Sequence, residues 1–147
     1  MNPLSYNVNN ESLSFSLGRL ISLVNQHKDQ LLDLHLEPFD ITAAQFRVLV
    51  AVHLYEMNSP AEVSKYLNID AGSMTRMLGR LIKKELIVKV PNTKDKRSVF
   101  IKLTTQGNSI LIGCMKSIDE DKVPSIAGDL SPQEIEQLIR LLTRLLP

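Results

Sequence analysis

The sequence predicts a mainly α-helical fold with one small β-hairpin. Helix starts are indicated by capping patterns, in which Ser or Thr is followed three residues later by Glu or Gln, and these occur at Thr42, Ser59 and Ser131. β-branched residues gather between 84 and 104 on both sides of the polar segment PNTKDKR, which is typical of a hairpin with a charged loop. A chain of 147 residues with 44% hydrophobic content is expected to form a single domain over 1–147.

Each expected helix begins at a cap and ends where its apolar pattern stops. Pro60 and Pro132 stand at first helical positions, where the missing N–H is not needed. Asp70 is expected to cap a further helix, because a carboxylate is favourable at the positive end of a helix, and Thr104 is expected to cap the helix after the hairpin. The expected helices cover 11–36, 42–54, 59–67, 70–84, 104–118 and 131–147.

The first and last helices carry more apolar surface than one neighbouring helix can cover. In the helix over 11–36, apolar residues alternate at spacings of three and four, which is the spacing of a seam that packs against a partner helix. The last helix repeats this spacing and has apolar residues on its other faces. We therefore predict dimerisation helices at 11–36 and 105–147; packing of both on a single domain is the alternative. The residues expected at the dimer interface are Leu17, Leu20, Ile135, Leu138, Leu142 and Leu145.

The charge is distributed unevenly along the chain. The formal net charge is only +1, but the segment 70–102 contains nine basic and three acidic residues, whereas 117–136 has a net charge of -5. A basic middle segment favours a polyanionic partner. The single cysteine, Cys114, cannot form an intramolecular disulfide, and the sequence has neither an apolar run of membrane-spanning length nor a signal peptide. A cytoplasmic location without a membrane partner is therefore expected.

Two capped helices, a short turn between them and a hairpin with a cationic tip have the element order of a winged helix-turn-helix. The helix-turn-helix is expected over 56–79 and the wing over 86–103, so the partner would be double-stranded DNA. Arg76 is expected to contact a guanine edge in the major groove, with contact to phosphate or solvent alone as the alternative. Asp95 is expected to orient the Arg97 guanidinium by a hydrogen bond. The predicted DNA contacts on the helix and wing are Asp70, Ser73, Thr75, Arg76, Arg80, Lys94, Asp95, Lys96 and Arg97.

At these motifs the chain resembles the multiple antibiotic resistance regulator (MarR) family over nearly its whole length. The similar segments are LGRLI, VNQ, DITAAQF, GSMTRMLGRL, PNTKDKRSV and KLTTQG, and DITAAQF with LTTQG looks close to the founding enterobacterial member. The resemblance implies a triangular homodimer that represses resistance or efflux genes from a palindromic operator and is released by phenolic or other aromatic acids. It also implies that Thr42 and Gln45 support phosphate contact.

The resemblance further implies where a small aromatic effector, such as a salicylate-like acid, would bind. Family positions beside the recognition helix fall on Pro60, Thr75, Met77, Arg80 and Lys89. A second family cleft would lie where the first, second and fifth helices meet. That cleft would be lined by His27, Leu31, Phe46 and Cys114.

Other classes of function find less support in the sequence. No nucleophile with its base, phosphate loop or metal cluster occurs at a useful spacing, so neither an enzyme nor a cofactor is expected. His27, His35 and His53 are expected to have structural roles, and one cysteine argues against redox sensing. The alternatives kept open are a winged-helix activator or anti-silencer, and a winged-helix module that binds only proteins.

Overall fold

The computed structural model describes residues 12–120 and 125–147, and the chain divides into two compact units. One unit combines the chain up to Leu31 with the segment from Ile126 onward, and the other covers 32–125. Helix α1 (Leu13–Leu36) begins in the first unit and ends in the second. The predicted helix start at residue 11 and part of the acidic segment 117–136 lie outside the described residues.

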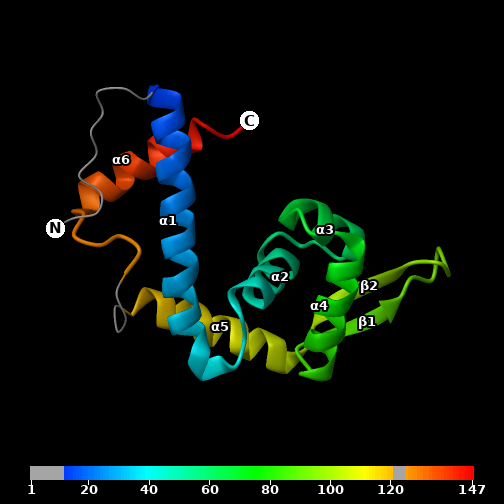
Figure 1. The fold of residues 1–147 in the computed structure, drawn as a ribbon. Coiled ribbons are helices and arrows are strands. Elements are labelled where there is room, and N and C mark those ends of the chain that lie inside the picture. The colour runs from blue at the N-terminus through cyan, green and yellow to red at the C-terminus, as the bar shows by residue number, and fades with distance from the viewer. Residues whose placement is uncertain (1–11, 121–124) are drawn as a thin grey trace. The chain divides into compact units, whose positions relative to one another are not determined.

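In the second unit the elements follow in the predicted order (Figure 1). They are the 3-10 turn η1 (Glu37–Phe39), helices α2 (Ala43–Leu54), α3 (Pro60–Leu67) and α4 (Ala71–Lys83), strands β1 (Ile87–Pro91) and β2 (Val99–Leu103), and helix α5 (Thr105–Asp119). The turn η1 is an addition to the prediction. It forms because Asp40 adopts a left-handed backbone conformation with φ 52°, from which its N–H donates to the Glu37 carbonyl.

The predicted helix caps are confirmed. The hydroxyl of Thr42 accepts from the Gln45 N–H at 3.1 Å, and the Gln45 side chain accepts from the Thr42 N–H in return. Ser59 and Glu62 form the same reciprocal pair at the start of α3. Asp70, Thr104 and Ser131 also accept hydrogen bonds from backbone N–H groups of the helices that they begin. Local sequence therefore sets where these helices start.

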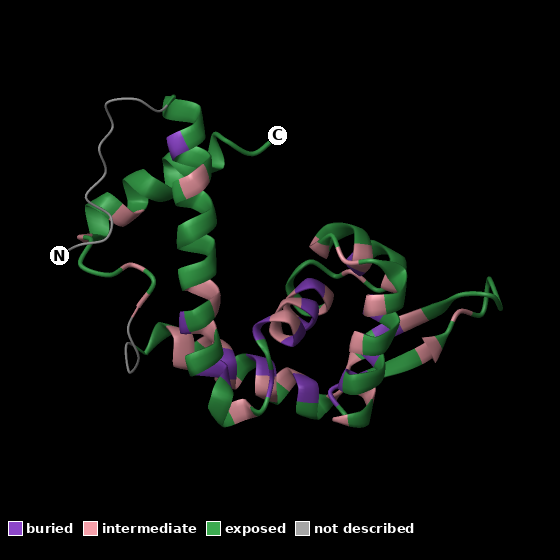
Figure 2. Cartoon of the chain, viewed as in Figure 1, coloured by how far each residue is buried: buried purple, intermediate pink, exposed green. Residues whose placement is uncertain are grey.

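The hairpin is joined to the rest of the second unit at its base. Strands β1 and β2 pair antiparallel, with Ile87 opposite Leu103, and their inward residues meet α2, α4 and α5 in one core (Figure 2). The Ile101 N–H also donates to the Asn58 carbonyl at 2.8 Å, so the connection between α2 and α3 lies beside β2. The largest fully buried side chains of this core are Leu36, Leu49, Met74, Leu81, Ile87, Ile101 and Leu111.

Gly107 allows the close approach of α5 to the start of the hairpin. The Thr104 N–H donates to the Leu86 carbonyl at 3.1 Å, and the Thr104 hydroxyl donates to the Glu85 carbonyl at 2.6 Å. A Cβ atom on Gly107 would lie 2.1 Å from the Leu86 carbonyl oxygen, which is far inside van der Waals contact. Only glycine therefore fits this position of α5.

The first unit contains most of α1 together with α6 (Pro132–Thr143). Helix α6 begins at the predicted cap but ends four residues before the C-terminus, whereas the prediction continued it to the last residue. None of its residues, all of which are described, is buried. An apolar groove of about 350 Å³ is lined by Leu17, Leu138, Leu141, Leu142, Arg144 and Leu145. None of the described helices combines the length and apolar character that a membrane span requires.

Candidate nucleic-acid interface

The exposed start of α4 carries a chain of three side-chain hydrogen bonds. Asp70 accepts from the Ser73 N–H at 2.9 Å and from the Ser73 hydroxyl at 2.7 Å. The Ser73 oxygen in turn accepts from a terminal nitrogen of Arg76 at 3.1 Å. The hydrogen bonds from Ser73 lower the pKa of Asp70, and the positive charge of Arg76 adds a smaller effect in the same direction. Arg76 is thus positioned by a carboxylate that stays ionised at neutral pH.

Helix α4 separates a core side from a solvent side. Met74, Leu78 and Leu81 are buried against the core, whereas Arg76 and Arg80 are exposed. Thr75 is also exposed, but its hydroxyl donates to the Ala71 carbonyl at 2.9 Å. The solvent side offers small residues for close backbone approach, Ala71, Gly72 and Gly79, and this combination suits a helix that enters the major groove.

Asp95 has a different hydrogen-bond partner from the predicted one. Its Oδ1 accepts from the backbone N–H of Arg97 at 3.0 Å, while the Nε of Arg97 lies 3.8 Å away, beyond hydrogen-bond distance. The predicted hydrogen bond to the guanidinium is therefore wrong, and only a loose ion pair joins the two side chains. Asn92 completes the turn by accepting from the N–H groups of Lys94 and Asp95. Asp95 shapes the loop backbone, and the guanidinium of Arg97 points into solvent with 96% of its side chain exposed.

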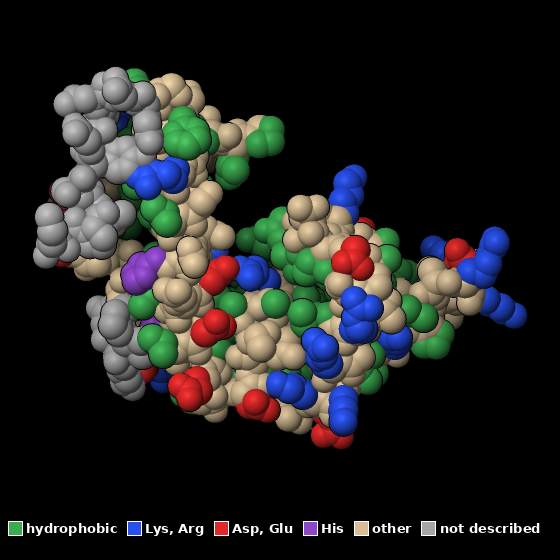
Figure 3. Space-filling view, viewed as in Figure 1, with side chains coloured by type: hydrophobic (Ala, Val, Ile, Leu, Met, Phe, Trp, Pro, Cys, Tyr) green, Lys and Arg blue, Asp and Glu red, His purple; other side chains and the backbone are tan. Residues whose placement is uncertain are grey.

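Basic side chains gather on the face of the second unit seen in Figure 3. Lys and Arg side chains lie along α4 and at the tip of the β1–β2 loop on that face. Lys94, Lys96 and Arg97 are all exposed, as are Arg76 and Arg80. Cations on a helix and on a neighbouring wing can contact phosphates on both sides of a groove.

Gln45 and Lys84 belong to a contact between α2 and the end of α4. Gln45 is only 5% exposed and its Oε1 already accepts from the Thr42 N–H, so it holds the start of α2 and cannot reach a phosphate itself. The ammonium of Lys84 lies 3.4 Å from the same oxygen and 3.5 Å from a carboxylate oxygen of Asp40. It also donates to the Asp40 carbonyl. No pattern in the sequence indicated this contact of Lys84. Thr42, which was expected to support contact with a phosphate, is exposed.

The residues predicted to bind an effector do not all meet in one hollow. Pro60 and Thr75 line a groove of about 600 Å³ between α3 and α4, with Ser64, Lys65 and Met74 among its other residues. Met77, Arg80 and Lys89 are not among the described residues that line this groove. Lys65 supplies a cation there that the sequence reasoning did not identify.

The second predicted cleft combines residues of both units. His27 is exposed on the part of α1 that belongs to the first unit, and Cys114 is fully buried in the core of the second. Burial raises the pKa of the Cys114 thiol to about 11. Within the described ranges, no group of three His, Cys, Asp or Glu residues could hold a metal ion.

Comparison with known proteins identifies the family. The MarR family model matches residues 41–99. The multiple antibiotic resistance protein MarR of Escherichia coli K12 is 44% identical over 131 residues, which are 89% of this chain and 91% of that protein. The chain belongs to the MarR family. Its relatives are transcriptional regulators and not enzymes.

Solved structures of MarR-family proteins share this fold. A mutant E. coli MarR in complex with operator DNA has a TM-score of 0.80 and 41% identity, covering 93% of this chain and all of that one. BpsR of Bordetella bronchiseptica, whose DNA binding is regulated by 6-hydroxynicotinic acid, has a TM-score of 0.76 and 25% identity, covering 88% and 98%. The predicted winged helix with a two-stranded wing is confirmed by these matches.

Proposed function

We propose that this MarR-family protein is a cytoplasmic repressor that binds a palindromic operator as a homodimer and releases it when a small aromatic acid binds. The regulated genes would be resistance or efflux genes. The observation that carries the DNA-binding part is the chain of hydrogen bonds from Asp70 through Ser73 to Arg76 at the exposed start of α4. A guanidinium held in this way loses little side-chain entropy when it meets a guanine. The solved complex of a mutant E. coli MarR with operator DNA also supports DNA binding by this chain.

The homodimer is supported by the apolar surface of the first unit. Leu138, Leu141, Leu142 and Leu145 remain between 42% and 53% exposed, and they line the apolar groove with Leu17. A monomer that exposed this surface would be prone to associate, because exposed apolar area favours burial against a partner. Two winged helices in one dimer would also match the two halves of a palindrome.

The aromatic effector is supported by the groove between α3 and α4. An acid could pair with Lys65 there while its ring contacts Pro60 and Met74. Because this groove lies against the recognition helix, a ligand in it is placed to change how well α4 fits DNA. Arg80, Lys89 and the His27 region stay proposed sites that the experiment below separates. Regulation of BpsR by 6-hydroxynicotinic acid supports an aromatic acid as the chemical class.

Selection from a pool of random DNA duplexes tests the DNA-binding part. The protein should recover a palindromic sequence, and its affinity should fall steeply as salt rises, because binding releases counterions from phosphates. Arg76→Ala should lose about 1 to 3 kcal/mol on the recovered operator and should relax base preference at one position. Arg97→Ala should weaken binding with less change in preference. Undiminished affinity of Arg76→Ala would remove this residue from base reading.

Calorimetric titration of salicylate tests the effector. An inducer must bind the free protein more tightly than the operator complex, because ligand and DNA then oppose each other reciprocally. Lys65→Ala, Arg80→Ala, Lys89→Ala and His27→Ala report which pocket is used. Equal affinity in the two titrations would show that salicylate is not an inducer.

A further inference from the structure

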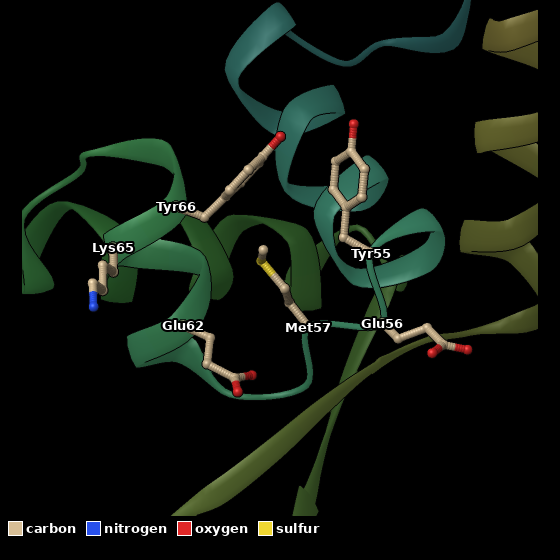
Figure 4. A pocket seen from close by; sticks show the side chains of 6 residues that line it. All are labelled: Tyr55, Glu56, Met57, Glu62, Lys65 and Tyr66. Carbon is tan, nitrogen blue, oxygen red and sulfur yellow. The ribbon is translucent and has the colours of Figure 1, made fainter. Parts of the chain in front are cut away.

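A second hollow lies where α2 ends and α3 begins, and none of its residues is assigned above to DNA or to the aromatic acid except Lys65. Its volume is about 570 Å³, and it is lined by Tyr55, Glu56, Met57, Glu62, Lys65 and Tyr66 (Figure 4). Two tyrosines, a thioether and two carboxylates form an unusual lining for a regulator whose middle segment is strongly basic.

The tyrosines form one aromatic wall of two rings. Their ring centroids are 5.2 Å apart and the rings are inclined by 57°, so the rings contact each other at a tilt and a ligand would meet both from the same open side. Both side chains keep about half of their surface exposed, at 53% for Tyr55 and 52% for Tyr66. In Figure 4 the Met57 side chain lies below the two rings and points toward them. A hydrogen bond with Tyr55 raises the pKa of Tyr66, so the Tyr66 ring is neutral at physiological pH.

The rim of the hollow is negatively charged. Two carboxylates, Glu56 and Glu62, line it against one ammonium, Lys65, and in Figure 4 the Glu56 and Lys65 side chains extend outward from the two rings. The Glu62 carboxylate is held in place because its Oε2 accepts from the backbone N–H groups of Asn58 at 3.2 Å and Ser59 at 3.3 Å. An anion entering the hollow would therefore meet a fixed negative charge.

We propose that this hollow binds a small organic cation with an aromatic or alkyl group. The face of a tyrosine ring attracts a cation through its quadrupole, and two adjoining rings offer a quaternary ammonium group more aromatic surface than one ring does. The carboxylates add attraction over a longer range, and the thioether of Met57 offers a polarisable contact for the apolar part of the ligand. The hollow shares only Lys65 with the groove between α3 and α4, so a cation and an aromatic acid could act on the same protein.

Tyrosine fluorescence provides a direct test. The chain has three tyrosines and no tryptophan, so in a Tyr6→Phe background the emission comes from Tyr55 and Tyr66 alone. Benzyltrimethylammonium, benzyl alcohol and benzoate are titrated into this full-length protein without DNA, so the result does not depend on operator binding. The cation should give a saturable change, with an affinity about fivefold or more above that of the neutral alcohol.

Matched variants assign the affinity to the hollow. Tyr66→Leu keeps apolar bulk without an aromatic face and should weaken the cation about two- to fivefold, whereas Tyr66→Phe should restore most of the binding. Glu62→Gln removes the charge but retains a capping-box residue, and it should also weaken the cation. Glu136→Gln on α6 is the control with the same charge change and should have no effect. Circular dichroism confirms that each variant is folded.

Three results would overturn the proposal. Equal affinity for the cation and the alcohol would show an apolar hollow without charge selectivity. Tighter binding of benzoate, lost in Lys65→Ala, would show an anion site. Unchanged cation affinity in both Tyr66→Leu and Glu62→Gln, or no saturable change at all, would show that the cation does not bind here.

Discussion

We expect Asp95 to favour DNA binding although its charge opposes it. Its carboxylate fixes the loop backbone at the Arg97 N–H. Asp95→Ala should therefore weaken operator binding by about 0.5 to 1.5 kcal/mol, the net contribution of one hydrogen bond. Asp95→Asn retains an acceptor and removes a negative charge near phosphates, so its affinity should equal or exceed that of the unmodified protein. Fluorescence anisotropy with a labelled operator measures both. If both variants lost the same operator affinity, the ion pair with Arg97, and not the backbone hydrogen bond, would be the contact that favours binding.

Cys114 should be chemically inert in the folded protein. Its thiol is fully buried, and burial raises its pKa from 9.0 to about 11. Iodoacetamide should modify it slowly at pH 8 and rapidly once denaturant unfolds the chain, because only the thiolate reacts. Since the folded-state pKa is the higher one, the stabilising contribution is complete below pH 9 and is lost as the pH rises towards 11. Cys114→Ala should show a smaller loss of stability over this range. Rapid modification of the native protein at pH 8 would contradict the burial.

At the scale of elements, the start of α4 depends on the Asp70 cap. The pKa of Asp70 is lowered by its hydrogen bonds with Ser73, so its contribution to stability is present above the ordinary value of 3.8 and is lost as the pH falls through the lowered value. Asp70→Asn should retain the cap and Asp70→Ala should not. Thermal unfolding at pH 7 should rank Asp70→Ala as the less stable. If the two variants unfold at the same temperature, the cap does not stabilise α4.

The junction of α5 with the hairpin should be the least tolerant of added volume. A methyl group on Gly107 would meet the Leu86 carbonyl, so Gly107→Ala should destabilise the protein by about 3 kcal/mol through overpacking. Gly79→Ala is the matched control, because nothing lies within 4 Å of its Cβ position on α4. It should stabilise the helix by about 0.5 to 1 kcal/mol. Urea unfolding compares the two, and a tolerated Gly107→Ala would show that the junction can open.

For the whole molecule, the main expectation is an obligate dimer. Leu138→Asp with Leu142→Asp would put two charges into the apolar groove of the first unit. The double variant should sediment as a monomer and lose operator affinity, because each half-site would then bind separately. Gln133→Asp, which adds a charge at a polar position of the same helix, should stay dimeric. A double variant that remains a dimer would place the interface elsewhere.

The sequence predicted best those features that depend on residues close together in the chain. Each cap is formed by residues three positions apart, so its place can be predicted from the sequence. The start of α4 was predicted in this way from the Asp70 side chain. Asp95 shows the limit of such reasoning. The backbone N–H and the guanidinium of Arg97 are both near Asp95 in the sequence, and only the turn geometry chooses between them.

Contacts between segments that are far apart in the chain could not be predicted from the sequence. Lys84 meets Asp40 and Gln45 through the packing of α4 against the start of α2, and no spacing along the chain indicates it. The contact between Tyr55, which directly follows α2, and Tyr66, which lies in α3, likewise depends on how the chain turns between the two helices. The effector residues beside the recognition helix were implied by resemblance to the family and lie on α3, α4 and β1, and the packing of these elements brings only Pro60 and Thr75 to the groove between α3 and α4.

The hydrogen bond from Ile101 to Asn58 has a consequence for the kinetics of release from DNA. It joins the wing to the residues before α3, so the two parts that we propose to contact DNA are connected over a short distance, as in a bivalent ligand with a short, stiff linker. If both parts contact the operator as proposed, the wing stays at a high effective concentration near its phosphates while α4 is bound, and it rebinds before the protein can diffuse away. Loosening this joint should shorten the residence time on the operator while leaving the rate of first encounter nearly unchanged.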